Sequence, residues 1–289
     1  MKIDIILYIL SLIILFLSFF AYFSQDPLST NIWKLITDLG SETYYMVFAI
    51  IIFHLIGGRI GFMAILALLL SGSLNIMIKE LVKIPRPTNP KIEETGYSFP
   101  SGHAQTSSSF WFIIYLIIKK NSLLFFSLVI IAAVSYSRIA LNVHYFQDII
   151  GGIVLGLAIA FLIFFIFKLK IKLLDLLLPI AIFIFSLTIF LTMVQDYKLI
   201  RISGVALGIS SYPIFIKLKL IKDEKNIGIK FKLIFLIINL IIVLFLTRLP
   251  LKDFLQIISY ILIGFSLTLF KYLTFYIKKF SEIKTLRKS

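Results

Sequence analysis

Cysteine is absent from this 289-residue sequence, so disulfide bonds are excluded and thiols say nothing about the redox compartment. Charged residues are also scarce, at 15% of the chain, and no domain linker, low-complexity tract or internal repeat interrupts it. What remains is apolar, because 60% of the residues are hydrophobic and the mean hydropathy is +1.03. Soluble globular domains do not reach these values. The composition therefore predicts an all-α polytopic membrane protein.

Apolar runs of the length that a membrane helix needs recur along the whole chain. A hydrocarbon core about 30 Å thick takes about 20 residues of helix. Ten candidate spans follow, near residues 4–24, 42–57, 60–78, 104–118, 122–137, 147–167, 173–194, 200–216, 231–246 and 254–277. The second, fourth and ninth are short enough for one of them to be re-entrant. We expect the first span to be a retained helix, because Asp4 weakens its basic start and no convincing cleavage site follows.

Basic residues outnumber acidic residues by 29 to 14, which gives a formal net charge of +15. They stand at the ends of the apolar runs and form no patch on a polar domain, so we expect the lipid bilayer, and no nucleic acid, as a partner. With ten spans, 19 of the 29 basic residues fall on the side that holds both termini. The positive-inside rule makes that side cytoplasmic. Because abundant Ile, Lys and Phe are typical of an AT-rich genome, we expect a bacterial cell membrane protein.

Three ionisable side chains stand close together in residues 137–148, which read SRIALNVHYFQD between two apolar runs. Arg138, His144 and Asp148 are costly to bury unless they pair with one another or with a charged ligand. If the segment after Asn142 is helical, His144 and Asp148 share a helix face and the carboxylate accepts the proton of one ring nitrogen. The other nitrogen then serves as a base, ligand or nucleophile. A pair that only satisfies two polar groups is the alternative.

Two cations stand at the outer end of the third predicted span. Lys79 precedes Arg86 by seven residues. Prolines on both sides of Arg86 stiffen its backbone, so that its guanidinium group has a restricted direction. Snorkelling to the headgroups is the alternative for Lys79.

A short segment, Pro100-Ser101-Gly102-His103, begins the fourth predicted span. A helix N-terminus offers unpaired N–H groups and a positive dipole end, and Gly102 lets the backbone approach an anion. The alternative is that Ser101 is a simple N-cap.

Alternation of the spans places all of these groups on one outer surface, because the third and fifth spans end where the fourth and sixth begin. Three cations, two histidines, one carboxylate and a helix N-terminus together describe a phosphate site. No cluster of carboxylates or histidines remains to hold a metal, so we expect no metal and no other cofactor. Three glycines predict close packing of the sixth span: Gly151, Gly152 and Gly156.

The three polar segments together resemble the signature of the type 2 phosphatidic acid phosphatase superfamily, which vanadium haloperoxidases and glucose-6-phosphatase share. The match in residue type, order and spacing covers Lys79 with Arg86-Pro87, Pro100 to His103, and Ser137-Arg138 with His144 and Asp148. It implies a six-helix phosphatase core over residues 1–168, with an extracytoplasmic active site. About four additional C-terminal transmembrane helices, over 169–289, lie outside the resemblance. Asn142, Phe146 and Gln147 differ from the residues expected between the fixed positions.

The resemblance also implies a role for each residue of the signature. His144 attacks phosphorus and forms a phosphohistidine while Asp148 orients it, and His103 protonates the leaving oxygen and then activates water. The phosphate oxygens are held by Lys79, Arg86, Arg138, Ser101 and the Gly102 N–H.

The implied function is a membrane phosphatase that acts on a lipid phosphate or a polyprenyl diphosphate. Undecaprenyl diphosphate, phosphatidate and phosphatidylglycerol phosphate all fit as lipid substrates, and a soluble sugar phosphate is an alternative. A phosphotransferase to a lipid or sugar hydroxyl is a second possibility. A carrier for phosphate-bearing solutes is a third, because ten spans and buried charges also suit transport. Haloperoxidase activity ranks last.

Overall fold

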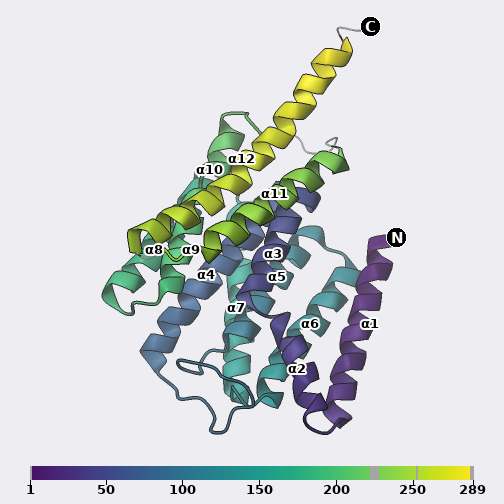
Figure 1. The fold of residues 1–289 in the computed structure, drawn as a ribbon, viewed down its shortest axis with the longest axis vertical. Coiled ribbons are helices and arrows are strands. Elements are labelled where there is room, and N and C mark those ends of the chain that lie inside the picture. Colours follow the sequence, from purple (N-terminus) through teal and green to yellow (C-terminus); the bar gives the residue numbers. More distant parts are fainter. Residues whose placement is uncertain (1, 222–227, 252, 287–289) are drawn as a thin grey trace. The chain divides into compact units, whose positions relative to one another are not determined.

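The computed structural model describes residues 2–221, 228–251 and 253–286, and their regular structure is entirely helical (Figure 1). The elements in chain order are α1 (Lys2–Phe23), α2 (Leu28–Asp38), α3 (Glu42–Ile51), the π-helix η1 (Ile52–Ile56), α4 (Gly58–Val82), α5 (Gly102–Ile118), α6 (Asn121–Ala140), α7 (Phe146–Lys168), α8 (Lys172–Thr192), α9 (Tyr197–Ile209), α10 (Ser211–Lys217), α11 (Ile229–Arg248) and α12 (Asp253–Leu286). The all-α membrane fold predicted from composition is confirmed. Some of the basic residues used for the charge count, in 222–227, 252 and 287–289, lie outside the described residues.

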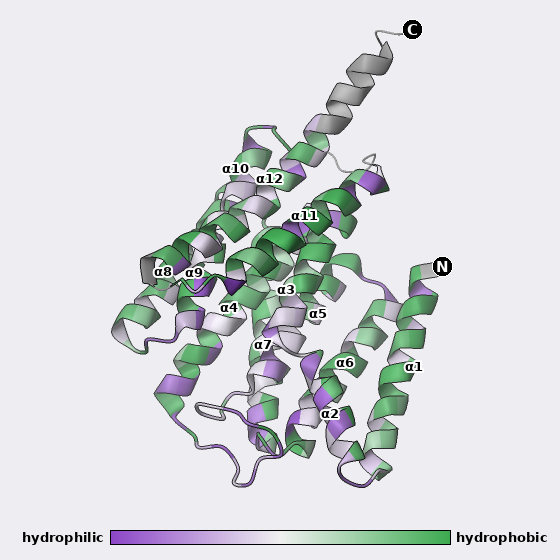
Figure 2. Cartoon of the chain, in the orientation of Figure 1, coloured by the Kyte–Doolittle hydropathy of each residue, from purple (hydrophilic) through white to green (hydrophobic). Residues whose placement is uncertain are grey.

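Eight helical segments of the described chain are long and apolar enough to cross a membrane, and hydrophobic residues dominate along them (Figure 2). The pair formed by α2 and α3–η1, bent by 44°, makes a ninth if it crosses as one span. The sequence predicts ten spans. The predicted span that is missing from these nine is α5, which has only 17 residues. Because α5 is largely buried within the protein, it can carry polar residues such as Ser107, Ser108 and Ser109. The four predicted C-terminal spans are present as α8, α9 with α10, α11 and α12.

Packing divides the chain into two compact units. Unit 1 contains the residues up to Met46 and Leu70–Lys168, and unit 2 contains Val47–Leu69 and Leu169–Ser289. Residues 47–69 were assigned by sequence to the first six spans, but by packing they belong with the C-terminal helices. The division of roles between 1–168 and 169–289 stays a prediction.

Close contact between α5 and α7 organises unit 1. A Cβ atom added at Gly152 would lie 2.6 Å from the carbonyl oxygen of Ser101, and one at Gly156 would clash with the carbonyl oxygen of Gln105. The close packing that these glycines predict is therefore confirmed. Its consequence is that the first turns of α5 and α7, which carry His103 and Asp148, lie together.

In unit 2, glycines likewise allow close packing where α9 crosses α12. A Cβ atom at Gly204 would lie 2.6 Å from Cβ of Tyr260, and one at Gly264 would lie 2.5 Å from the carbonyl oxygen of Val205. Small residues thus let these helices approach through their backbones.

Candidate active site

The turn between α6 and α7 places His144 just before a helix. Asn142 has a left-handed backbone with φ 53°, a conformation that asparagine tolerates better than most residues. The amides of Asn142 and Val143 donate to the carbonyl oxygens of Ile139 and Arg138 at 2.9 and 3.1 Å, which is a Schellman ending. Helix directly after Asn142, the condition under which the sequence places His144 and Asp148 on one helix face, is not met, because this ending stops α6 and α7 begins only at Phe146.

His144 and Asp148 nevertheless meet. Nδ1 of His144 lies 3.2 Å from Oδ2 of Asp148, and the same oxygen accepts the backbone N–H of Tyr145 at 2.8 Å. Asp148 thus stands at the third position of α7 and reaches back to the residue before the helix, as in half of a capping box. His144 is 4% exposed and Asp148 is fully buried. Since a carboxylate only accepts, Nδ1 is assigned as the protonated ring nitrogen.

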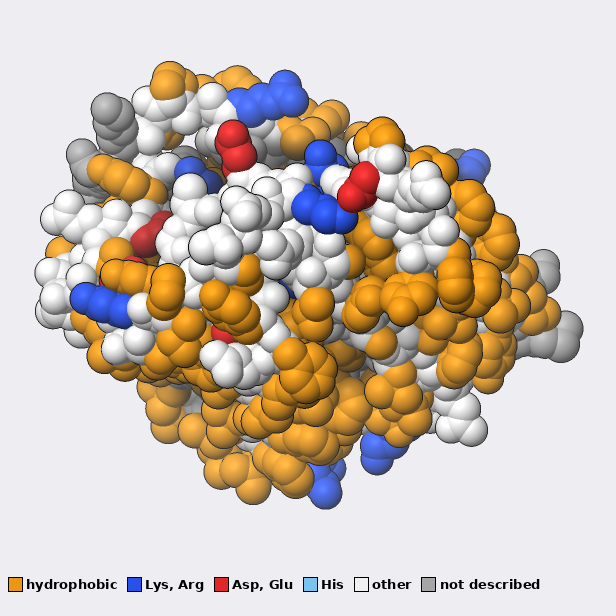
Figure 3. All heavy atoms as spheres, turned by 90° about the horizontal axis from the view of Figure 1, so that it is seen from below, with side chains coloured by type: hydrophobic (Ala, Val, Ile, Leu, Met, Phe, Trp, Pro, Cys, Tyr) orange, Lys and Arg blue, Asp and Glu red, His pale blue; other side chains and the backbone are white. Residues whose placement is uncertain are grey.

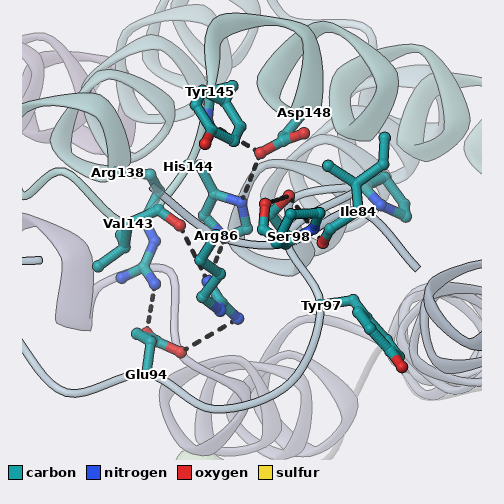
Figure 4. A network of polar contacts seen from close by, with 12 residues as sticks. Ile84, Arg86, Glu94, Tyr97, Ser98, Arg138, Val143, His144, Tyr145 and Asp148 are labelled. Atoms are coloured by element: carbon teal, nitrogen blue, oxygen red, sulfur yellow. Dashed lines mark hydrogen bonds and ion pairs between the residues drawn. The ribbon is translucent and has the colours of Figure 1, made fainter. Parts of the chain in front are cut away.

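The second ring nitrogen of His144 faces an arginine (Figure 4). Nε2 lies 3.1 Å from Nη1 of Arg86, which also donates to the carbonyl oxygen of Val143 at 3.1 Å. Burial lowers the pKa of His144 to about 4 and the positive charge of Arg86 adds to this, although the bond to Asp148 opposes it. The imidazole is therefore neutral near pH 7, with a lone pair on Nε2 directed toward a cation.

Arg86 is held mainly by the loop that follows it. Its Nε donates to the carbonyl oxygen of Gly96 and its Nη2 to that of Thr95, each at 3.0 Å. Nη2 also lies 3.6 Å from Oε2 of Glu94. These contacts place the guanidinium beside His144, as the stiff backbone around Arg86 suggests.

Arg138 is the largest fully buried side chain in the described part of the protein, at 1% exposure. Its Nη1 donates to Oγ1 of Thr37 at 2.8 Å, and its Nη2 donates to Oε1 of Glu94. Its Nε is buried and has no hydrogen-bond partner among the described residues. A buried guanidinium with one donor still unused is well placed to bind an anion.

Lys79, near the end of α4, points into the loop. Its Nζ donates to the carbonyl oxygen of Tyr97 and lies 3.5 Å from that of Ser98. It is close enough to interact electrostatically with Arg86, Arg138 and Asp148. Snorkelling does not describe this lysine, because its charged group is bound by protein carbonyls.

The segment from Pro100 to His103 is anchored on both sides. The amide of Ser101 donates to the carbonyl oxygen of Asp148 at 3.0 Å, and Asn75 of α4 donates to the carbonyl oxygen of Pro100 at 3.1 Å. The Ser101 side chain makes no capping bond to α5, and its buried Oγ has no partner among the described residues. The N-cap alternative for this hydroxyl is therefore not supported. A Cβ atom at Gly102 would lie 3.2 Å from Oδ1 of Asn75, so the backbone here is close to its neighbours.

His103 lies in the first turn of α5, with its ring beside Gly40. A Cβ atom at Gly40 would lie 3.1 Å from Cδ2 of His103. Thr37, the partner of Arg138, is three residues earlier in the chain, so the junction between α2 and α3 borders both side chains.

The sequence did not single out Glu94 or Thr37, although both contact the predicted arginines. Glu94 is one of two adjacent acids in a loop, and Thr37 is one hydroxyl in an amphipathic helix, so neither has a local signal that sets it apart. The described residues contain no group of three or more His, Cys, Asp or Glu side chains that could hold a metal ion. Independence from metals stays a prediction.

Comparison with known proteins gives a family match, a relative and a solved structure. The profile of the PAP2 superfamily matches residues 60–172, which include all three polar segments. Phosphatidylglycerophosphatase B of Bacillus subtilis (strain 168) is 30% identical over 157 residues, which cover 48% of this chain and 75% of the relative. The crystal structure of the first transmembrane PAP2 type phosphatidylglycerolphosphate phosphatase from Bacillus subtilis aligns with a TM-score of 0.46 and 26% identity, over 59% of this chain and 98% of that one.

Proposed function

This chain belongs to the PAP2 superfamily, and from that membership we propose that it removes the terminal phosphate from a lipid phosphate through a phosphohistidine on His144. The observation that carries the proposal is the environment of this histidine. Asp148 holds Nδ1 at 3.2 Å while Nε2 faces Arg86 at 3.1 Å. A neutral imidazole between a carboxylate and a cation is a suitable nucleophile for a phosphate ester.

The reaction runs in two displacements. Nε2 of His144 forms a bond to phosphorus as the ester or anhydride P–O bond breaks, and Asp148 stabilises the imidazolium character that develops. His103 gives a proton to the leaving oxygen, then takes one from the water that attacks the phosphohistidine. That attack releases inorganic phosphate and restores neutral His144.

Charge on the transferring phosphoryl group is stabilised by fixed donors. Arg86 and Arg138 offer planar guanidinium groups, Lys79 offers a point charge, and Ser101 with the Gly102 N–H offers neutral donors. The unused Nε of Arg138 and the unused hydroxyl of Ser101 support this assignment, because both are buried without a partner among the described residues. All of these residues lie within 1–168, which supports the proposal that this part forms the phosphatase core.

The loop between α4 and α5 supports an active site at the water boundary. It lies at the lower end of Figure 1, and seen from below this end exposes polar groups and charged side chains of both signs among hydrophobic ones (Figure 3). We assign this end to the extracytoplasmic surface of a bacterial cell membrane, with both termini in the cytoplasm, on the distribution of basic residues.

A lipid substrate is favoured by the exposed apolar face that starts beside the site. On α7, Phe146 is 68% exposed, Ile150 47% and Val154 58%, at four-residue intervals that form one stripe. A phosphate headgroup at His144 leaves its acyl or prenyl chain against this stripe. The similarity to phosphatidylglycerophosphatase B makes phosphatidylglycerol phosphate the first substrate to test, and undecaprenyl diphosphate the second.

The test is a substrate panel on purified protein in detergent, with chelator present and inorganic phosphate as the readout. We expect the protein to release inorganic phosphate from lipid phosphates. We expect His144→Ala to lose this activity and His54→Ala to keep it, because His54 lies in η1 of unit 2. Preference for a sugar phosphate, transfer to an added alcohol without phosphate release, or uptake into liposomes without hydrolysis would each contradict the proposal.

A further inference from the structure

One carboxylate, Glu94, bridges the two arginines assigned to the substrate phosphate. Its Oε1 accepts from Nη2 of Arg138, and its Oε2 lies 3.6 Å from Nη2 of Arg86. Figure 4 shows the two oxygens directed at different guanidinium groups. A carboxylate presents two oxygens with a negative charge to an arginine, much as a phosphate group does.

The charge of Glu94 is maintained in this position. Its side chain is 24% exposed, and burial alone would raise the pKa of the carboxyl group. Arg138 and Arg86 outweigh that effect and hold the pKa of Glu94 below its ordinary value. The arginines are therefore paired with an ionised internal ligand at neutral pH.

The rest of the loop fastens Glu94 in place. The amide of Lys91 donates to the carbonyl oxygen of Leu141 at 2.9 Å. Nδ2 of Asn142 donates to the carbonyl oxygens of Thr88 and Asn89 at 2.8 and 3.1 Å. Asn142 differs from the residue that the family resemblance leads us to expect, and these bonds give it a role in holding the loop against the α6–α7 turn.

We propose that Glu94 is a specificity-determining residue, which occupies the arginine donors until a substrate phosphate displaces it. The inference rests on the proposed function, because it assumes that Arg86 and Arg138 bind substrate phosphate. A terminal phosphomonoester carries up to two negative charges and three free oxygens, so it competes well with one carboxylate. A phosphodiester carries one charge and two free oxygens, so it gains little by displacing Glu94. The carboxylate thereby favours lipids with a terminal phosphate over the diester lipids that surround the protein.

The test measures binding of inorganic phosphate to the purified full-length protein by calorimetry, at fixed pH and ionic strength. Glu94→Gln leaves the arginines without a competing charge, so we expect phosphate to bind about five- to tenfold more tightly than to the wild type. Glu93→Gln is the matched control, since it removes the same charge from the adjacent, exposed residue. We expect the phosphate affinity of Glu93→Gln to stay within about twofold of that of the wild type.

A second variant keeps the test decisive if Glu94→Gln does not fold. Glu94→Asp retains the charge but is one methylene shorter, so it cannot span both arginines, and we expect phosphate affinity to rise about two- to threefold. Unchanged or weaker phosphate binding in the folded Glu94 variants would overturn the inference, as would an equal gain in Glu93→Gln. A merely structural role for Glu94 predicts weaker binding, because the arginines would lose their positions.

The binding measurement needs no turnover, so it separates this inference from the proposed function. Tighter phosphate binding in Glu94→Gln, in a protein that hydrolyses no lipid phosphate, would refute the function and support only the competition between Glu94 and phosphate for the arginines. Hydrolysis of lipid phosphate without any gain in phosphate binding would support the function and overturn the inference.

Discussion

The backbone amide of Ser101 donates to the carbonyl oxygen of Asp148 at 3.0 Å. The same Asp148 holds Nδ1 of His144 through its carboxylate. One residue therefore links the start of α5 to the histidine before α7, through its backbone on one side and its side chain on the other. This link gives the histidine and the helix end proposed to bind the phosphate a fixed relative position.

Asp148→Asn tests how much the orientation of His144 contributes. The amide is a poorer acceptor for the Nδ1 proton and carries no charge to stabilise an imidazolium, so we expect kcat for phosphate release to fall about 10²- to 10⁴-fold. Asp196→Asn, at the N-cap of α9, is the control, because asparagine also caps helices well. Near-normal kcat in folded Asp148→Asn would contradict the assigned role.

Gly152→Ala tests the contact between α5 and α7. The new methyl group would stand 2.6 Å from the carbonyl oxygen of Ser101, so α7 must shift away from α5. We expect a loss of stability of about 1–3 kcal/mol and a lower kcat, measured by thermal unfolding and phosphate release. Gly228→Ala is the control, since the nearest atom of the described residues, Cδ2 of Phe231, would be 3.9 Å from its Cβ. Equal stability and equal kcat in the two variants would show that the contact between α5 and α7 does not determine activity.

Thr37→Val tests the support of Arg138. Valine keeps the shape of threonine but removes the hydroxyl that accepts from Nη1 at 2.8 Å, which leaves a buried donor unpaired. We expect kcat/KM to fall roughly tenfold, mainly through KM, because Arg138 is assigned to binding. Thr30→Val is the control, as its hydroxyl bonds to exposed Asp26. A change in thermal stability without a change in KM would show that Thr37 acts on folding alone.

The protonation of His144 depends on its burial and on the neighbouring arginine. Burial lowers its pKa to about 4, so the ring of the substrate-free protein stays neutral down to that pH. An unfolded chain binds this proton from about pH 6.5, so the folded state loses stability as the pH falls from about 6.5 toward 4. We expect ¹⁵N-histidine NMR spectra to contain one ring that titrates near pH 4.

The signal from His144 is identified by its absence in His144→Gln. A His144 ring that titrates near pH 6.5 in the folded, substrate-free protein would contradict the buried, cation-facing geometry.

Sequence by itself determined the helices, their membrane character and the three polar segments. These features are local, because a chain in lipid must satisfy its backbone within each helix and because apolar runs of sufficient length are visible in one dimension. The spacing within each polar segment is likewise local and can be read from the sequence: Lys79 to Arg86, Pro100 to His103 and Arg138 to Asp148.

Only the tertiary structure decided which groups meet. Glu94 lies 44 residues from Arg138 and Thr37 lies 101 residues from it, so their bonds depend on how the loop and α2 pack rather than on any local pattern. The same holds for residues 47–69, which pack with the C-terminal helices, and for α5, which can carry polar side chains because other helices bury it. These contacts depend on packing between helices, because a buried charged group pairs with the polar groups that the fold brings within hydrogen-bond distance.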